Sequence, residues 1–129
     1  MPTGGWTVKA IIITGSREWD NADAILDVLL DENPSIVIHG ACRGADQIAD
    51  YHASNMGRTV IAMPAQWDRD GKGAGPGRNS MMGNVLGAMQ DCGHTVHVHA
   101  FPMPGSRGTW DMVNRVCKEL GLPVTVHKS

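Results

Sequence analysis

The chain has 129 residues, which is the length of one domain with a buried core. Its formal net charge is −2, with 11 Lys and Arg against 13 Asp and Glu, so no overall positive charge favours nucleic acid as a partner. A single Phe, a single Tyr and four Trp are too few to indicate a stacking platform for single strands. Composition therefore argues against nucleic acid as the partner.

The cysteines and the N-terminal residues indicate the compartment. Cys42, Cys92 and Cys117 are far apart and lack the spacing of a metal site. Residues 1–6 contain no basic region followed by a long apolar run, so no signal peptide is predicted. No apolar run approaches the roughly 20 residues that a membrane-spanning helix needs. We expect a cytoplasmic protein with reduced thiols and no contact with a membrane.

Short apolar runs alternate with amphipathic ones along the chain. Strands are predicted at 8–14, 35–39, 59–63, 95–101 and 123–127. Helices are predicted at 21–31, 44–56, 79–90 and 108–120, and the segment 64–77 is too rich in glycine and charge for regular structure. This alternation predicts an α/β fold with three layers: a Rossmann-like parallel sheet of order 3-2-1-4-5 with helices on both faces. One such domain would span 1–129, with its core at about 8–127.

Four turns that contain both glycine and arginine come directly before the helical patterns. They are Thr14-Gly15-Ser16-Arg17, Gly40-Ala41-Cys42-Arg43-Gly44, Gly75-Pro76-Gly77-Arg78-Asn79 and Pro104-Gly105-Ser106-Arg107-Gly108-Thr109. Glycine allows close approach of a ligand, a helix N-terminus offers unpaired N–H groups, and arginine matches phosphate or carboxylate oxygens. The order 3-2-1-4-5 places the first and the last of these turns on the two walls of the crevice where such sheets bind ligands. The predicted ligand-binding residues are Thr14, Gly15, Ser16, Arg17, Gly40, Arg43, Gly44, Asp46, Arg78, Asn79, Gly105, Ser106, Arg107, Gly108 and Thr109.

Several of these side chains have two interpretations. Asp46 could accept from ribose hydroxyls, act as a general base, or cap its own helix. Asn79 could contact a base or cap its own helix. Trp67, together with Asp68, Arg69 and Lys72, could form a lid in which the indole stacks on a purine, or it could pack on the third helix.

Other features favour structural roles. His97 and His99 share one face of the fourth strand, but no third ligand accompanies them, so no metal site is predicted. Cys42 lacks a base that would make it a nucleophile. Met81, Met82 and Met89 are predicted to lie in the core or on a homodimer surface.

Taken in order, the four turns resemble the YspA/YpsA-related branch of the SLOG superfamily over about 8–126. The resemblance implies a Rossmann-like fold that binds nucleotides or nucleotide-derived ligands, with no required cofactor. The segment from Gly40 to Asp46 is similar to the glycine-rich segment of the DNA-processing protein DprA. The segment from Gly105 to Thr109 resembles the phosphate-binding PGGxGT signature of the LOG phosphoribohydrolases, with Ser106 in place of the second glycine.

The resemblance also raises the question of catalysis. LOG enzymes carry a glutamate three residues after the signature threonine, where this chain has Met112, with Asp111 one residue earlier. Glycosidic cleavage needs a carboxylate near the anomeric carbon, for which Asp46 and Asp111 are the candidates. Arg78 is the candidate for the LOG arginine. We therefore expect nucleotide binding, with cleavage of the N-glycosidic bond of a nucleoside 5′-monophosphate as the alternative and DprA-like single-strand binding as a third.

Overall fold

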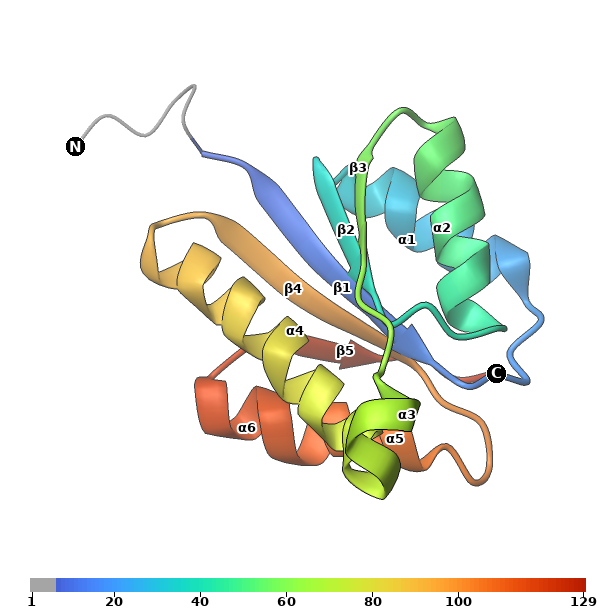
Figure 1. Ribbon diagram of the computed structural model, residues 1–129. Helices are drawn as coiled ribbons and strands as arrows, with labels where there is room; N and C mark the ends of the chain where they lie inside the picture. Colours follow the sequence, from blue (N-terminus) through green and yellow to red (C-terminus); the bar gives the residue numbers. More distant parts are fainter. Residues whose placement is uncertain (1–6) are drawn as a thin grey trace.

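The computed structural model describes residues 7–129, so the expectation that concerns residues 1–6 lies outside the described residues. Five parallel strands form one sheet of order β3-β2-β1-β4-β5, which confirms the predicted fold class and strand order (Figure 1). The strands are β1 (Lys9–Gly15), β2 (Ile36–His39), β3 (Thr59–Ala62), β4 (Thr95–Phe101) and β5 (Val124–Val126). The helices are α1 (Ala22–Glu32), α2 (Ala45–Asn55), α3 (Trp67–Asp70), α4 (Ala74–Asp91), α5 (Arg107–Asp111) and α6 (Cys117–Leu120).

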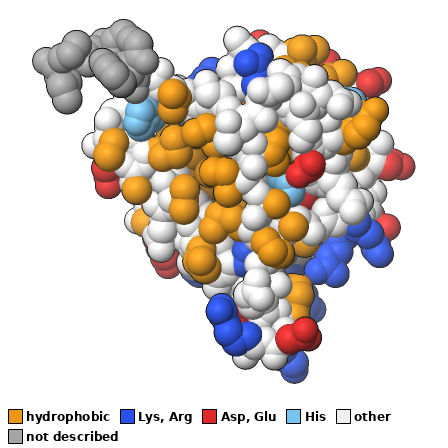
Figure 2. Space-filling model, turned by 45° about the horizontal axis from the view of Figure 1, so that its top comes forward, with side chains coloured by type: hydrophobic (Ala, Val, Ile, Leu, Met, Phe, Trp, Pro, Cys, Tyr) orange, Lys and Arg blue, Asp and Glu red, His pale blue; other side chains and the backbone are white. Residues whose placement is uncertain are grey.

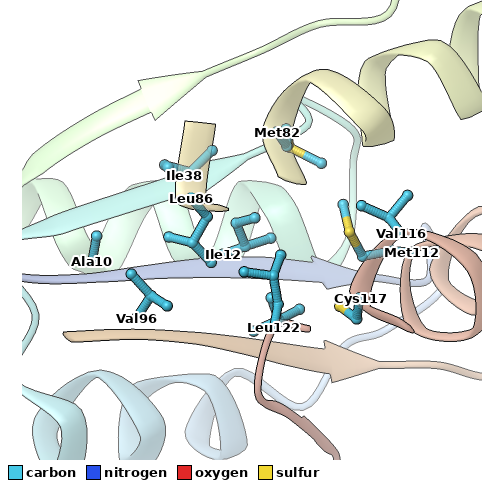
Figure 3. Close-up of a cluster of buried hydrophobic side chains, with 11 residues drawn as sticks. Ala10, Ile12, Ile38, Met82, Leu86, Val96, Met112, Val116, Cys117 and Leu122 are labelled. Carbon is cyan, nitrogen blue, oxygen red and sulfur yellow. The ribbon is translucent and has the colours of Figure 1, made fainter. Parts of the chain in front are cut away.

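The central strand β1 is buried on both faces, as its nearly continuous apolar sequence predicts. On one face, Ile11 and Ile13 pack in a cluster with side chains of α1 and α2. On the other, Ile12 packs in a cluster with side chains of α4 and of the C-terminal helical segments, which include Leu86 and Met112 (Figure 3). The helices therefore form a layer on each side of the sheet.

The segment 64–77 is predicted to lack regular structure, and this prediction is wrong. It contains α3, a 3-10 turn η1 (Gly71–Gly73) and the start of α4, which begins at Ala74 and not at residue 79. The sequence Gly75-Pro76-Gly77 suggests a turn, but it lies in the first turn of α4. There Pro76 is tolerated because N–H groups in the first turn have no partner within the helix.

The last predicted helix, 108–120, consists of three segments that follow one another without a break. A π-helical segment, η2 (Met112–Val116), separates α5 from α6. Such segments are rare and occur frequently at functional sites. Here the π-helical segment directly follows Thr109 and Asp111, two of the predicted site residues.

Two surface properties bear on the expected partners. No helix within residues 7–129 is long and apolar enough to cross a membrane. Figure 2 shows hydrophobic side chains gathered on one face of the molecule. Among the exposed large hydrophobic residues are Ile61 on β3 and Met81 and Val85 on α4. Met82 by contrast is buried in the core. A homodimer through this face stays a prediction.

Candidate functional site

A cavity of about 600 Å³ lies where β1 and β4 end, at the point where the strand order reverses. Its volume lies in the range of small-molecule sites. Four separate parts of the chain form its wall: the turn after β1, the loop before α2 with the start of α2, the α3–α4 segment, and the start of α5. The lining residues are Thr14, Gly15, Ser16, Arg17, Cys42, Asp46, Trp67, Lys72, Gly75, Pro76, Arg78, Asn79, Met82, Ser106, Arg107, Gly108, Thr109 and Asp111.

The turn after β1 is packed tightly against its neighbours. A Cβ atom on Gly15 would overlap the Cβ of Ala45 and the backbone of Phe101. The N–H of Ser16 donates to the carbonyl of Phe101, and the carbonyl of Ser16 accepts from the N–H of Ala45. Glycine at position 15 is therefore needed for packing between elements. Close approach of a ligand, which the sequence suggested, is not required to explain it.

The loop 40–44 before α2 is held by side chains from β2 and α2. Asp46 Oδ2 accepts from the N–H groups of Gly40 (3.1 Å) and Cys42 (3.2 Å). His39 Nδ1 accepts from the N–H of Ala41 at 2.9 Å, which keeps Ala41 at the unusual φ of 59°. The interpretation of Asp46 as a cap of its own helix is wrong, because Gly44 is the N-cap and Asp46 holds the preceding loop instead.

Asp46 also presents a free carboxylate oxygen. Its Oδ1 is buried and has no hydrogen-bond partner among the described residues, although Asp46 lines the cavity. Burial raises the pKa of the Asp46 carboxyl group to about 6, against the opposing effect of the N–H groups of Cys42 and Gly40. A buried polar atom without a partner is uncommon in folded proteins. Oδ1 is therefore a hydrogen-bond acceptor that the described residues leave unused.

Arg78 is occupied by the protein itself. Its guanidinium donates to the carbonyl oxygens of Gly40 (2.5 Å) and Met63 and to the side chain of Asn79. A Cβ atom on Gly40 would overlap this guanidinium. Arg78 therefore fastens the loop 40–44 to α4, and its predicted contact with a phosphate would require these hydrogen bonds to be shared.

Asn79 and Asp111 join α4 to α5. Asn79 Nδ2 donates to the carbonyl of Gly108 (3.0 Å) and to Asp111 Oδ2 (3.1 Å). The interpretation of Asn79 as a cap of its own helix is wrong, because Asn79 lies inside α4. Both interactions link residues about 30 positions apart, and the sequence contains no local signal for them.

Arg115 orients Asp111. Its Nε donates to Asp111 Oδ1 at 2.7 Å and its Nη2 to Asp111 Oδ2 at 2.9 Å. The hydrogen bond from Arg115 lowers the pKa of Asp111, with a smaller effect of the same sign from Asn79. Asp111 is therefore an ionised carboxylate of fixed orientation. Sequence reasoning missed Arg115, although Asp and Arg four residues apart on a predicted helix are a recognised pair.

Three cations of the cavity wall are unpaired. The side chains of Arg17, Lys72 and Arg107 have no hydrogen bond or ion pair within residues 7–129. Arg43 differs, because its Nη2 lies 2.6 Å from Glu18 Oε1 on the exposed surface, outside the cavity wall. The structure thus brings three unpaired cationic side chains to the cavity, whereas Arg43 lies outside its wall.

The turn before α5 is open. No described side chain caps the first turn of α5, because Ser106 Oγ accepts from the N–H of Met103 instead. A Cβ atom on Gly108 would have no described atom within 4 Å. The first N–H groups of the helix are therefore available to an anion. Gly105 lies outside the cavity wall and adopts φ 83°, which favours glycine.

Two of the four residues expected in a lid contribute to the wall. Trp67 and Lys72 line the cavity, and the indole of Trp67, 48% exposed, lies against Gly75. Asp68 and Arg69 lie outside the wall, and Arg69 pairs with Asp70. Trp67 thus packs on α4 and faces the cavity at once, so both interpretations of its role are compatible with its position.

Comparisons with known proteins agree with this architecture. The family model of the YspA, cpYpsA-related SLOG family matches residues 9–69. The Gene 61 protein of Mycobacterium phage D29 is 35% identical over 127 residues, which cover 91% of this chain and 94% of the phage protein. The C-terminal domain of a hydrogenase from Pyrococcus furiosus has a TM-score of 0.54 at 15% identity, covering 93% of this chain and 91% of that one, and shares the fold. The chain belongs to the YspA, cpYpsA-related SLOG family.

Proposed function

We propose that the chain binds a nucleotide or a nucleotide-derived small molecule in the cavity between β1 and β4. The observation that carries this proposal is the set of unpaired cations, Arg17, Lys72 and Arg107, around a concave site of about 600 Å³. Free arginines beside an uncapped helix N-terminus favour an anion with several oxygens, such as a phosphate. Membership of the SLOG family and the α/β fold are consistent with nucleotide-related binding.

The chemistry of the wall suggests how such a ligand would lie. The phosphate would bind at the start of α5, where Arg107, Gly108 and Thr109 line the cavity and no side chain caps the helix. The buried Oδ1 of Asp46 would accept a hydrogen bond from a ribose hydroxyl. The base would contact Trp67, since an aromatic face stacks on any base.

Calorimetry with a panel of nucleoside mono-, di- and triphosphates tests this proposal. We expect at least one of these nucleotides to bind at a single site. We expect Arg107→Ala to weaken its affinity about 10- to 100-fold, as the loss of a hydrogen bond to a charged group does. Arg43→Ala is the matched control, because Arg43 is also exposed but lies outside the wall. Absence of binding, or equal affinity in both variants, contradicts the proposal.

A second candidate, cleavage of an N-glycosidic bond, is favoured by one observation about the same cavity. Its two carboxyl groups differ in character: burial raises the pKa of Asp46 to about 6, whereas Arg115 lowers the pKa of Asp111. Two titratable groups in one site whose surroundings shift their pKa values in opposite directions are typical of acid–base catalysis. Asp46 would then transfer a proton to or from the substrate, and ionised Asp111 would stabilise the oxocarbenium-like transition state.

Free base released from nucleoside 5′-monophosphates is the measurement that tests the second candidate. We expect Asp46→Asn and Asp111→Asn each to abolish release while the fold is retained. If the wild-type protein binds a nucleotide but releases no base, cleavage is contradicted and the binding proposal remains.

A further inference from the structure

A second cluster of titratable side chains lies outside the cavity wall. It consists of Glu32, the last residue of α1, and of His97 and His99 on β4. One ligand atom from each residue lies within 4.8 Å of the other two. His97 is paired with Ile11 and His99 with Ile13, so both imidazoles lie on the face of the sheet that carries α1.

Each histidine of the cluster is oriented by a neighbour. His97 Nε2 lies 2.7 Å from the Thr125 hydroxyl, and His99 Nδ1 lies 2.9 Å from His127 Nε2. These contacts leave Nδ1 of His97 and Nε2 of His99 for another partner, and His99 Nε2 lies 2.7 Å from Glu32 Oε2. Metal-binding histidines almost always have their second ring nitrogen held in this way, which fixes the tautomer and the ring direction.

The surroundings of the cluster are partly dry. His99 is 6% exposed, and the Glu32 and His97 side chains are half-buried. Lys9 is the one described cation in contact, and its Nζ lies 3.0 Å from Glu32 Oε1, which leaves Oε2 to face His99. The two imidazole rings are stacked with their centroids 4.5 Å apart.

We propose that Glu32, His97 and His99 form a binding site for a divalent transition metal of the zinc type. Two imidazoles and one carboxylate are a known zinc ligand set that leaves a coordination position open to water. Imidazole ligands favour such ions over Mg²⁺ and Ca²⁺. The metal takes the place of the proton between His99 and Glu32, and His99 then carries its proton on Nδ1 and donates it to His127. The third ligand was not recognisable in the sequence because Glu32 is 67 residues away from His99.

Zinc bound there would join the end of α1 to β4. Since the unfolded chain does not hold these residues together, the metal binds the folded state preferentially and stabilises it. Zinc binding is therefore expected to raise the unfolding temperature, whether or not a nucleotide is present.

The full chain without a histidine tag, freed of metal with a chelator, is titrated with Zn²⁺ in a calorimeter. We expect one Zn²⁺ per chain, a higher unfolding temperature in Zn²⁺, and no comparable effect of Mg²⁺. His97→Ala should remove both effects, whereas His52→Ala, which changes a histidine on α2, should retain them. If the wild-type protein binds no Zn²⁺ saturably, or if His97→Ala binds it as well as the wild type, the proposal is overturned.

Two further variants distinguish a metal site from a purely structural network. Thr125→Val removes the hydroxyl that orients His97 and should weaken Zn²⁺ binding about tenfold, as the loss of such outer contacts does. Glu32→Gln keeps the shape but removes the charge, and it should abolish the visible absorption of bound Co²⁺. Variants that lose stability without metal but bind Zn²⁺ and Co²⁺ like the wild type contradict the assignment.

Discussion

Gly15 at the end of β1 and Gly44 before α2 look like Gly105 and Gly108 around the start of α5 in the sequence, but the two groups have different surroundings in the structure. Cβ atoms on Gly15 and Gly44 would overlap protein atoms, whereas Cβ atoms on Gly105 and Gly108 would have no described atom within 4 Å. The first group lets three elements pack closely at the end of the sheet. The second group leaves space at a helix N-terminus. Close packing and open space are therefore found at different turns near one cavity.

Gly44→Ala should have the largest effect, because its Cβ would overlap the backbone of Ser16 and Arg17 at a φ of +76°. We expect the free energy of unfolding to fall by about 3 kcal/mol or more, from overpacking together with left-handed strain. Gly57→Ala is the matched control, since Gly57 has φ +74° but no described atom within 4 Å of a Cβ. It should lose about 1 kcal/mol, the cost of the strain alone. Urea unfolding measures both, and equal losses would contradict the role of packing at Gly44.

The raised pKa of Asp46, in the closely packed region at the end of β1 and the start of α2, can be tested through the pH dependence of stability. Burial raises the pKa of Asp46 from 3.8 to about 6, so between these pH values the folded protein holds a proton that the unfolded chain has lost. Stability due to this group is therefore present below pH 3.8 and is lost as pH rises through about 6, by on the order of 3 kcal/mol.

Asp46→Asn removes this dependence. We expect the difference in free energy of unfolding between Asp46→Asn and wild type to shift in favour of the variant as pH rises from about 4 to about 7. Glu32 and Asp111, whose pKa values are lowered, change stability in the opposite direction but equally in both proteins, so they cancel in the difference. Urea unfolding at a series of pH values measures it, and a constant difference would refute the raised pKa.

Fold and site differed in how far they could be predicted from the sequence. The alternation of apolar runs and helical patterns was sufficient to predict the strand order of the sheet. The rules for right-handed connections between parallel strands leave few alternative orders. The segment 64–77 was predicted wrongly, because Pro76 was interpreted as a turn residue although it lies in the first turn of α4. Residue type alone could not show why Gly15 is glycine, since the atoms it must avoid belong to Ala45 and Phe101.

The side chains around the cavity show the same limit. Arg17 and Arg107 were placed on opposite walls of one crevice from strand order alone, and both line the cavity. Arg43 and Arg78 have the same local sequence pattern, but Glu18 pairs with the first and the Gly40 carbonyl accepts from the second. These partners are 25 and 38 residues away, beyond any local pattern.

Trp67→Ala tests whether the exposed indole at the cavity contributes to nucleotide binding. If a base stacks on the indole, its loss should weaken nucleotide binding by about 1–3 kcal/mol, which is roughly 5- to 150-fold. Trp110→Ala is the control, because Trp110 is similarly exposed but lies outside the cavity wall. Calorimetry with the nucleotide that binds the wild type measures both variants. A loss of equal size in Trp110→Ala would show that Trp67 has no special part in binding.

Gly108→Ala should have the smallest effect on stability and separates the two groups of glycines most directly. Its Cβ would enter open space in the first turn of α5, so the free energy of unfolding should stay the same or increase by up to about 1 kcal/mol, since alanine favours a helix more than glycine. The same methyl group would project where a phosphate is proposed to meet the helix N-terminus. Nucleotide affinity should therefore fall although the free energy of unfolding does not. Urea unfolding and calorimetry on one preparation measure the two quantities. If the variant binds nucleotide as tightly as the wild type, the proposed position of the phosphate at this turn is wrong.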